Sequence, residues 1–255
     1  MHCMWNERQA IEVFHLLFLR ALGARVDKSL FALKGGCNLR FFLKSIRYSE
    51  DMDLDIRTMS VGTLRNNVDR VLEAPSFLQT LRAQNIEILR AASPKQTETT
   101  QRWKLTLKLI QNGTEVPTKI EFSRRALDPD AVNEPVDAEI IRTYRLYPVI
   151  VQHYPATVAF AQKVLALALR AQIQSRDLFD LKLLLDAGAG NASLPRKVAS
   201  ELPKAIENAM EVGYDDFAGQ VLAYLEPEYQ QHYKDKKAWA ALQDEVVGAL
   251  EGLAR

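Results

Sequence analysis

Three aspartates occupy every second position of the segment "EDMDLDI", residues 50–56. Alternate side chains of a β-strand face the same way, so Asp51, Asp53 and Asp55 are expected to share one face, and the apolar residues between them the other. Two carboxylates about 6 Å apart repel by roughly 3 kcal/mol at an effective dielectric constant near 20. Solvation, protonation, nearby cations or a bound divalent metal ion can relieve that repulsion. The pattern therefore indicates either a metal site or the solvated face of a half-buried strand.

A glycine pair lies upstream of these acids, in "LFALKGG" at residues 30–36. We interpret this segment as a short strand that runs into a turn at Gly35 and Gly36, with a helix at 38–44 leaving that turn. Glycines let backbone N–H groups approach a triphosphate closely, and a helix N-terminus favours anionic charge. Glycines followed by Ser-Glu-Asp-x-Asp-Leu are far more specific than a glycine pair alone, and they indicate nucleotide chemistry.

The whole stretch "LKGGCNLRFFLKSIRYSEDMDL", residues 33–54, resembles the first motif of nucleotidyltransferases of the DNA polymerase β type. More narrowly it resembles the AbiEii toxin family, in which Lys-Gly-Gly-Thr, an Arg and Arg-x-Ser-x-Asp-x-Asp recur. Cys37 stands where that family usually has a hydroxyl residue. A thiol is a weaker hydrogen-bond donor to phosphate, so this departure is expected to alter nucleotide affinity or choice. The residues that the resemblance places at the nucleotide are Lys34, Gly35, Gly36, Cys37, Arg47 and Ser49, with Asp51 and Asp53 as catalytic metal ligands.

A third acid is expected on a neighbouring strand in enzymes of this type, and "TKIEFS", residues 118–123, offers Glu121. Alternation puts Lys119, Glu121 and Ser123 on one face. Glu121 is thus the predicted third catalytic carboxylate and metal ligand. The alternative is a solvated glutamate paired with Lys104 or Lys108 on the partner strand.

The C-terminal half contains "QKVLALALRAQIQSRDLFDL", residues 162–181. The family resemblance implies that Lys163 neutralises the triphosphate, and that Asp177 and Asp180 orient this lysine or bind base or sugar. We therefore expect Lys163 and Asp177 to be catalytic and Asp180 to bind nucleotide. The alternatives are that both aspartates stabilise a helix by lying in its first turns, near the positive end of its dipole, and that Lys163 is an ordinary surface lysine.

The elements that position these residues follow from hydrophobic periodicity. The pair of strands at 102–110 and 118–123 is joined by a loop that contains Asn112 and Gly113, a strong hairpin signal. Pro117 places the start of the second strand at a sheet edge or outside the ladder. The remaining predicted elements are helices at 6–22, 38–44 and 63–72 and strands at 30–36 and 50–56.

Residues 128–155 are loop-like, with four prolines, and the periodicity beyond them is helical. We predict helices at 155–174 and 175–188, the second with Ser175 as N-cap, and more helices to the C-terminus. The predicted class is α+β: a small mixed sheet with flanking helices in a nucleotidyltransferase domain, residues 1–150, then an all-helical domain, residues 151–255, that completes an active-site cleft.

Composition excludes several other classes. The 255 residues carry 33 Lys and Arg against 32 Asp and Glu, so the net charge does not indicate binding to a nucleic acid or an anionic membrane. A basic stripe at Arg102, Lys104 and Lys108 could follow a phosphate backbone or be the solvated face of a sheet. Cys3 and Cys37 match no disulfide framework and suit a reducing cytosol. No stretch approaches the roughly 20 apolar residues of a membrane span. We expect a cytoplasmic protein.

The resulting hypothesis is transfer of a nucleoside monophosphate from an NTP to an acceptor hydroxyl, with two Mg²⁺ ions held by Asp51, Asp53 and Glu121. The resemblance further implies a toxin that acts on RNA at tRNA acceptor ends, with a cognate antitoxin encoded nearby. Two alternatives stay open: nucleotidylation of a small molecule such as an antibiotic, and a catalytically silent binding module of the same fold.

Overall fold

The computed structural model describes residues 5–124 and 127–254, so Cys3 lies outside the described residues. The chain forms two compact units. The first comprises Met1–Phe42 and Ser49–Tyr154, and the second comprises Leu43–Tyr48 and Pro155–Arg255. Residues 43–48, shortly before the aspartate strand, thus belong to the second unit. The chain passes between the units three times.

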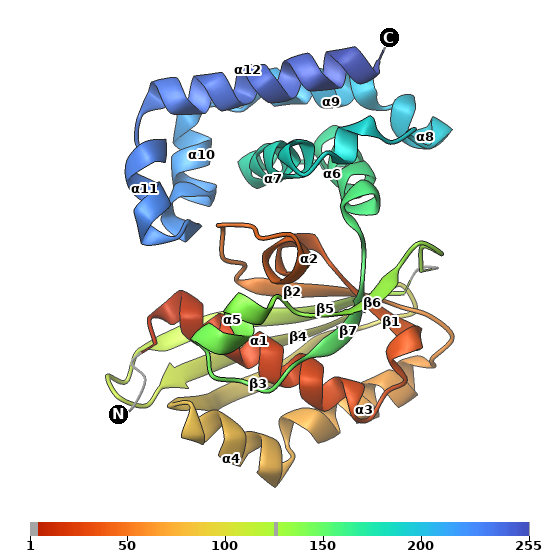
Figure 1. The fold of residues 1–255 in the computed structure, drawn as a ribbon. Helices are drawn as coiled ribbons and strands as arrows, with labels where there is room; N and C mark the ends of the chain where they lie inside the picture. Colours follow the sequence, from red (N-terminus) through yellow and green to blue (C-terminus); the bar gives the residue numbers. More distant parts are fainter. Residues whose placement is uncertain (1–4, 125–126, 255) are drawn as a thin grey trace. The chain divides into compact units, whose positions relative to one another are not determined.

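Within the described residues of the first unit, seven strands form one mixed sheet in the order β3-β4-β5-β2-β1-β7-β6 (Figure 1). The aspartate strand β2 lies near its centre, antiparallel to β1 and parallel to β5. The start of β5 pairs with β4 alone, because β2 pairs only from Lys119 onward, so Pro117 lies where no second neighbour needs its missing N–H. The strands are β1 (Phe31–Lys34), β2 (Asp51–Ile56), β3 (Ile86–Gln96), β4 (Thr100–Leu109), β5 (Glu115–Ser123), β6 (Val132–Pro135) and β7 (Ile150–His153).

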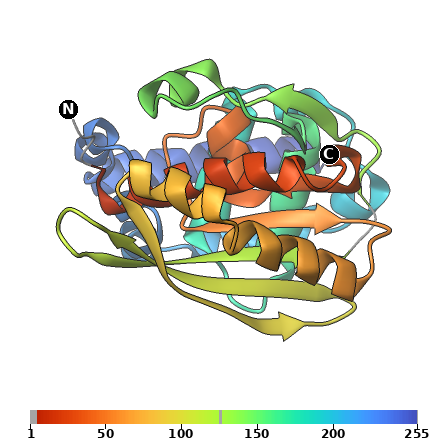
Figure 2. The ribbon, with the colours of Figure 1, turned by 90° about the horizontal axis from the view of Figure 1, so that it is seen from below.

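Three helices cover the apolar face of this sheet: α1 (Glu7–Gly23), α3 (Val61–Leu72) and α4 (Pro75–Ala83), which lie across it in Figure 2. Helix α1 begins at a capping box in which Asn6 and Gln9 satisfy each other's backbone N–H groups. The strands contribute their apolar alternate residues to the core beneath these helices. Those at the centre of the sheet are less than 2% exposed: Met52, Leu54, Trp103, Leu107, Ile120 and Phe122. Burial of this face leaves the opposite face of β2, β4 and β5 to the charged residues.

The segment 128–155 is not the simple loop that its prolines predicted. It contains β6, the helix α5 (Ala138–Thr143) and β7. Pro135 ends β6 at the sheet edge, where a missing N–H costs nothing. β7 pairs with β1 and β6, and this long-range pairing overrides the local turn signals. The expected boundary at residue 150 coincides with the first residue of β7, and the sheet unit continues through Tyr154.

The second unit is helical in its described residues, and the predicted α+β class is confirmed. The predicted helix at 155–174 ends earlier, since Arg170 leaves the helical region at ψ 140 and α7 begins at Ser175 after Gln174 as N-cap. No helix within residues 5–124 and 127–254 is long and apolar enough to cross a membrane. The helices are α6 (Ala156–Leu169), α7 (Ser175–Asp186), α8 (Arg196–Ala199), α9 (Leu202–Glu211), α10 (Tyr214–Gln220), α11 (Pro227–Tyr233) and α12 (Lys236–Leu253).

Candidate active site

The predicted carboxylates of the first unit lie on one face of adjacent strands. β2 and β5 run parallel with Asp53 opposite Glu121 and Asp51 opposite Lys119. Residues paired across a sheet project to the same side, so Asp51, Asp53 and Glu121 share the polar face. The parallel register therefore brings Glu121 beside Asp51 and Asp53, which lie 70 and 68 residues before it in the chain.

A continuous row of charged residues crosses four strands at the level of Asp53. Lys34 of β1 is opposite Asp53, Asp53 is opposite Glu121, and Glu121 is opposite Arg102 of β4. Across these four strands the order is therefore cation, acid, acid, cation. The flanking cations limit the repulsion that the aspartate spacing alone would produce.

Short ion pairs hold most of these charges. Arg102 Nε lies 2.6 Å from Glu121 Oε2, and Lys119 Nζ lies 3.0 Å from Asp51 Oδ2. Glu121 was expected either to bind metal or to pair with Lys104 or Lys108. Its partner is Arg102, because the hairpin register sets Lys104 opposite Lys119 and Lys108 opposite Glu115.

The third aspartate of the ladder has a different role. Lys34 Nζ lies 2.5 Å from Asp55 Oδ1 and 2.9 Å from Ser123 Oγ, and the Tyr154 hydroxyl donates to Asp55 Oδ2 at 2.8 Å. Asp55 is 6% exposed. Lys34, which the motif placed at the nucleotide, is therefore engaged by the sheet itself.

Asp53 is the least compensated acid of the ladder. Burial raises the pKa of Asp53, and Glu121 and Asp51 add to this effect, while Lys119 and Lys34 oppose it. A carboxylate whose ionised form is disfavoured gains more than its neighbours from a cation that arrives from solution. This residue therefore has the electrostatics expected of a metal ligand.

The glycine turn lies directly against Asp53. Gly35 begins α2 (Gly35–Phe42) with a φ of +66°, which only glycine adopts readily. A Cβ atom at Gly35 would lie 3.2 Å from Asp53 Oδ2. The first N–H groups of α2, from Gly35 and Gly36 onward, have no acceptor within the helix. The turn thus places N–H groups that lack a partner within the helix beside the carboxylates.

Cys37 and Ser49 support the backbone of β2. The Cys37 thiol donates to the Asp51 carbonyl oxygen at 3.3 Å, and the Ser49 hydroxyl donates to the same oxygen at 2.9 Å. Cys37 is 1% exposed and also lies 3.5 Å from His15 Nδ1. Burial raises the pKa of this thiol well above its usual range. Both residues were expected at the nucleotide, and in the structure both bind the strand that carries the acids.

The donor set suits a hard divalent cation, because Asp51, Asp53 and Glu121 offer carboxylate oxygens on one face. Within the described residues, however, no group of three His, Cys, Asp or Glu side chains is arranged ready to hold a metal ion. Lys119 and Arg102 occupy oxygens of Asp51 and Glu121 instead. The residues fit such an ion by chemistry and by face once Lys119 leaves Asp51, since Arg102 contacts only the Oε2 atom of Glu121.

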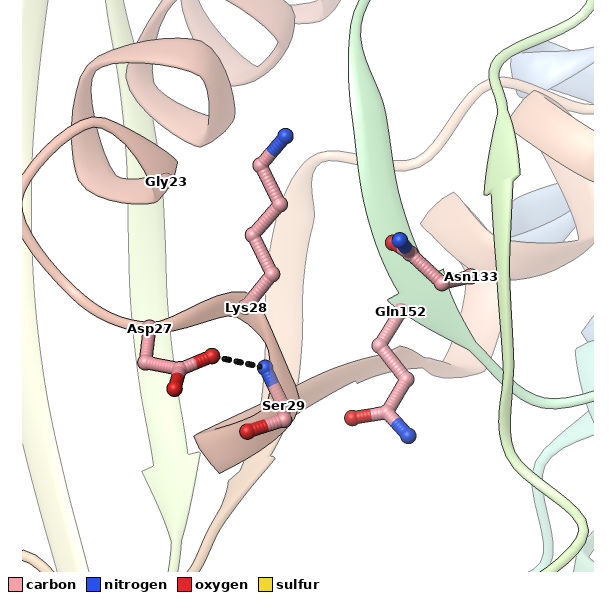
Figure 3. Close-up of a pocket in the computed structure, with 6 residues that line it drawn as sticks. All are labelled: Gly23, Asp27, Lys28, Ser29, Asn133 and Gln152. Carbon is pink, nitrogen blue, oxygen red and sulfur yellow. Dashed lines mark hydrogen bonds between the residues drawn. The ribbon is translucent and has the colours of Figure 1, made fainter.

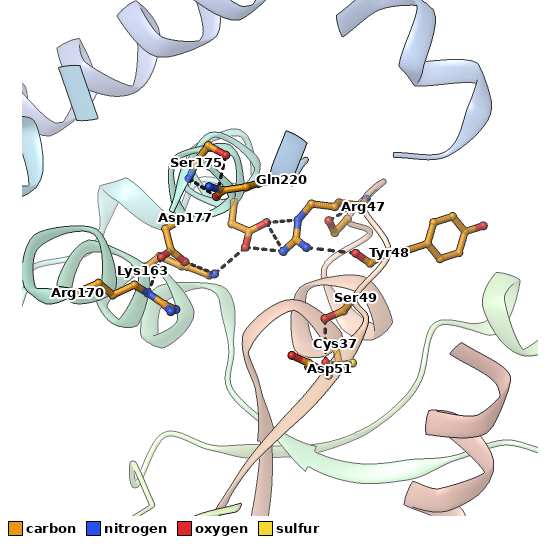
Figure 4. A network of polar contacts seen from close by, with 12 residues as sticks. Cys37, Arg47, Tyr48, Ser49, Asp51, Lys163, Arg170, Ser175, Asp177 and Gln220 are labelled. Atoms are coloured by element: carbon orange, nitrogen blue, oxygen red, sulfur yellow. Dashed lines mark hydrogen bonds and ion pairs between the residues drawn. The ribbon is translucent and has the colours of Figure 1, made fainter. Parts of the chain in front are cut away.

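The predicted residues of the helical unit form a buried ionic network. Lys163 Nζ lies 2.7 Å from Asp177 Oδ1 and 2.6 Å from Asp180 Oδ2. Both aspartates are fully buried, and the Lys163 side chain is 10% exposed. Arg170 Nε reaches Asp177 Oδ2 at 2.8 Å from the break after α6 (Figure 4). Lys163 is thus no ordinary surface lysine.

Arg47 belongs to this second network. Its guanidinium group makes a forked contact with Asp180, with Nε 3.1 Å from Oδ1 and Nη2 2.9 Å from Oδ2. Burial alone would raise the pKa of Asp180, but Arg47 and Lys163 outweigh burial and hold it below its usual range. The segment around Arg47 also bridges Leu225 through its backbone. Arg47, expected at the nucleotide, anchors this segment to the helical unit.

Sequence reasoning missed Lys119 and Arg102 as members of the carboxylate cluster. Alternation in β5 gave a signal for Lys119, which lies on the face of Glu121. Arg102 required the hairpin register, which depends on the length of the loop between β4 and β5.

Two surface hollows contain none of the predicted site residues. One, of about 470 Å³, is lined by polar residues that include Lys28 and Asn133 (Figure 3). The other, of about 590 Å³, lies between α3, α4 and the outer strands and includes Asp69 and Trp103. The predicted site residues therefore lie outside both hollows.

Comparison with known proteins gives one family match and two similar solved structures. Residues 17–251 match the family profile described as nucleotidyl transferase AbiEii toxin, type IV TA system. The structure is similar to JHP933 from Helicobacter pylori, with 18% identity, a TM-score of 0.61 and coverage of 98% of this chain and 96% of that chain. It is equally similar to an H. pylori protein described as a candidate nucleotidyltransferase, with 17% identity, a TM-score of 0.61 and coverage of 99% and 100%. Curated proteins yield no significant match.

Proposed function

Because the chain belongs to the AbiEii family of nucleotidyltransferase toxins of type IV toxin–antitoxin systems, we propose that it transfers a nucleoside monophosphate from an NTP to an RNA hydroxyl, with the tRNA acceptor end as the acceptor. The observation that carries this proposal is the shared face of Asp51, Asp53 and Glu121 beside the turn at Gly35. The reaction breaks the bond between the α- and β-phosphates and releases pyrophosphate.

Asp51, Asp53 and Glu121 are the residues that would hold Mg²⁺. Two such ions, when bound, activate an attacking hydroxyl and stabilise the charge of the leaving phosphate. The chain's own contribution is to keep three oxygen donors on one rigid sheet face and to remove Asp53 partly from water. Glu121 is also the carboxylate that we assign to accepting the proton of the acceptor hydroxyl.

We assign the phosphates of the NTP to the glycine turn and to the cations of the protein. N–H groups at the start of α2 and the dipole of that helix favour anionic oxygens. Lys163, held by Asp177 and Asp180, is a rigid cation that we assign to neutralising the triphosphate. Arg47 and Ser49 contribute indirectly, because they position Asp180 and the backbone of β2.

An RNA acceptor is supported by the basic extension of the same sheet face. Lys104 is opposite Lys119, and Lys95 is opposite Arg102. Lys95 and Lys104 are exposed, and neither takes part in an ion pair within the described residues. Unpaired cations in line with the carboxylates provide a path for a phosphate backbone.

The decisive experiment incubates the purified protein with each labelled NTP, Mg²⁺ and total tRNA, and sizes the product. We expect label on tRNA, dependence on the divalent ion and loss of labelling with Asp53→Asn. Periodate-oxidised tRNA, which lacks the terminal diol, is the control for the acceptor end. Label on an aminoglycoside or lincosamide but not on RNA would replace the RNA acceptor with a small molecule. Absence of transfer to any acceptor would favour a silent binding module.

The toxin role has a cellular test. We expect induced expression to arrest growth, and co-expression of an antitoxin encoded by a neighbouring reading frame to restore it. NTPs and tRNA are the substrates, so we place the protein in the cytoplasm. Growth arrest by Asp53→Asn at equal protein levels would separate toxicity from nucleotide transfer.

A further inference from the structure

Lys119 lies between two of the carboxylates assigned to metal. Its Nζ atom is 3.0 Å from Asp51 Oδ2 and 4.0 Å from Glu121 Oε2. It comes from the central strand β5, directly opposite Asp51 and two residues before Glu121. Its side chain is 26% exposed, so water and ions can reach it.

The cluster needs this cation when no metal is present. Asp51, Asp53, Asp55 and Glu121 share one face with the cations Lys34, Lys119 and Arg102. Lys34 is committed to Asp55, and Arg102 is committed to Glu121. Among the described residues, Lys119 is the cation that lies within 4.0 Å of both Asp51 and Glu121. Without it, Asp51 would keep no ion pair within the described residues, and its repulsion from Asp53 and Glu121 would be less compensated.

We propose that Lys119 is a positioning residue that acts as the internal counter-ion of the carboxylate cluster and is exchanged for the divalent ion. This inference rests on the proposed function, because it concerns the same metal ligands. An ammonium group that pairs with Asp51 competes with metal for that oxygen. Lys119 therefore keeps the ligands assembled in the metal-free protein and at the same time lowers their affinity for metal.

A lysine suits this exchange better than an arginine. Its ammonium group is a compact point charge on a flexible four-carbon stem, so it can leave one carboxylate without disturbing the strand. A guanidinium group in the same place would hold two oxygens in a fixed fork and resist release. The chain uses arginine for the Glu121 partner, Arg102, and lysine where exchange is needed.

Lys104 offers a matched control. It lies opposite Lys119 on the neighbouring strand β4 and on the same face, and its side chain is exposed. It takes part in no ion pair within the part of the chain that the structure describes. Lys104→Gln therefore removes the same charge from the same surface without releasing a carboxylate.

The test is titration of Mn²⁺ into the metal-free protein, followed by calorimetry or by the electron paramagnetic resonance signal of free Mn²⁺. We expect Lys119→Gln to bind Mn²⁺ about three- to fivefold more tightly than the wild type, since release of one partly exposed ion pair is worth that much. Lys104→Gln should stay within about twofold, since screening weakens an unpaired surface charge. Lys119→Arg should bind no more tightly than the wild type.

Thermal unfolding provides the second measurement. Without metal, Lys119→Gln should unfold at a lower temperature than the wild type, and Mn²⁺ should raise its midpoint by more than that of the wild type. Equal or weaker Mn²⁺ binding by Lys119→Gln, with binding by the wild type intact, would overturn the role of Lys119 and leave the proposed function standing. Failure of the wild type to bind Mn²⁺ and to transfer nucleotide would overturn both.

Discussion

Gly35 lies so close to Asp53 that a Cβ atom at Gly35 would be 3.2 Å from Asp53 Oδ2. The glycine turn thus lies directly against the aspartate strand, although 17 residues separate Gly35 from Asp53 in the chain. Because a Cβ atom here would displace the Asp53 carboxylate, this contact favours a glycine at this position beyond the requirement for a positive φ.

The first prediction concerns this contact. Gly35→Ala should lower the free energy of unfolding by about 1 kcal/mol through its left-handed backbone, and it should also displace Asp53 and reduce nucleotide transfer at least tenfold. Gly113→Ala is the matched control, because Gly113 has a φ of +73° and open space around its Cβ position. Chemical denaturation and transfer assays check both. Equal activity of the two variants would show that the Gly35 contact is unimportant.

The second prediction separates two aspartates of one strand. Asp53→Asn should abolish transfer and leave the protein equally or more stable, because burial already disfavours the ionised form of Asp53. Asp55→Asn should cost about 1–3 kcal/mol, because Lys34 and Tyr154 lose a buried acceptor. Denaturant unfolding and Mn²⁺ binding of both variants provide the measurements. Marked destabilisation by Asp53→Asn would contradict the description of Asp53 as an acid whose ionised form is disfavoured by burial.

The third prediction concerns the helical unit. Asp180→Asn should destabilise the protein by about 3–5 kcal/mol, since it leaves Arg47 and Lys163 buried without that carboxylate. Asp186→Asn on the same helix breaks an exposed pair with Lys182 and should cost less than about 0.5 kcal/mol. Since the pKa of Asp180 is lowered in the folded state, its stabilisation is full above the ordinary carboxyl pKa and is lost as the pH falls through the folded value. Urea titrations at pH 7 and below pH 4 test both points.

The fourth prediction is a pH dependence from His15. This residue is fully buried, with Nε2 2.9 Å from Thr118 Oγ1, and burial lowers its pKa from 6.5 to about 3. The unfolded chain therefore binds a proton between pH 6.5 and pH 3 that the folded protein does not bind. Stability should fall by about 1.4 kcal/mol per pH unit from this residue as the pH drops below 6.5.

His15→Gln should flatten this dependence, whereas His232→Gln, at an exposed position of α11, should not. Burial also lowers the pKa of His153, so some slope should remain in the His15 variant. Denaturant unfolding from pH 4 to pH 7 gives the slopes. An unchanged slope in His15→Gln would contradict a neutral buried imidazole.

Much of the first unit could be predicted from local patterns. The helix at 6–22, the aspartate strand and the β4–β5 hairpin follow from hydrophobic periodicity and from Asn112 and Gly113, which act over a few residues. The strand β3 and the pairing of β7 could not be predicted in this way. Both depend on partners far along the chain, and no local signal marks them.

The amino-acid sequence by itself determined which chemical groups this protein carries and which of them share a strand face, because strand alternation and glycine conformation are local properties. It therefore predicted Asp51, Asp53, Glu121 and the glycine turn as the candidate site. Only the tertiary structure decided their partners: Arg102 for Glu121, Lys119 for Asp51, and Asp180 for Arg47. These pairs depend on strand register and on the return of residues 43–48 to the helical unit, and both are set by packing between distant segments.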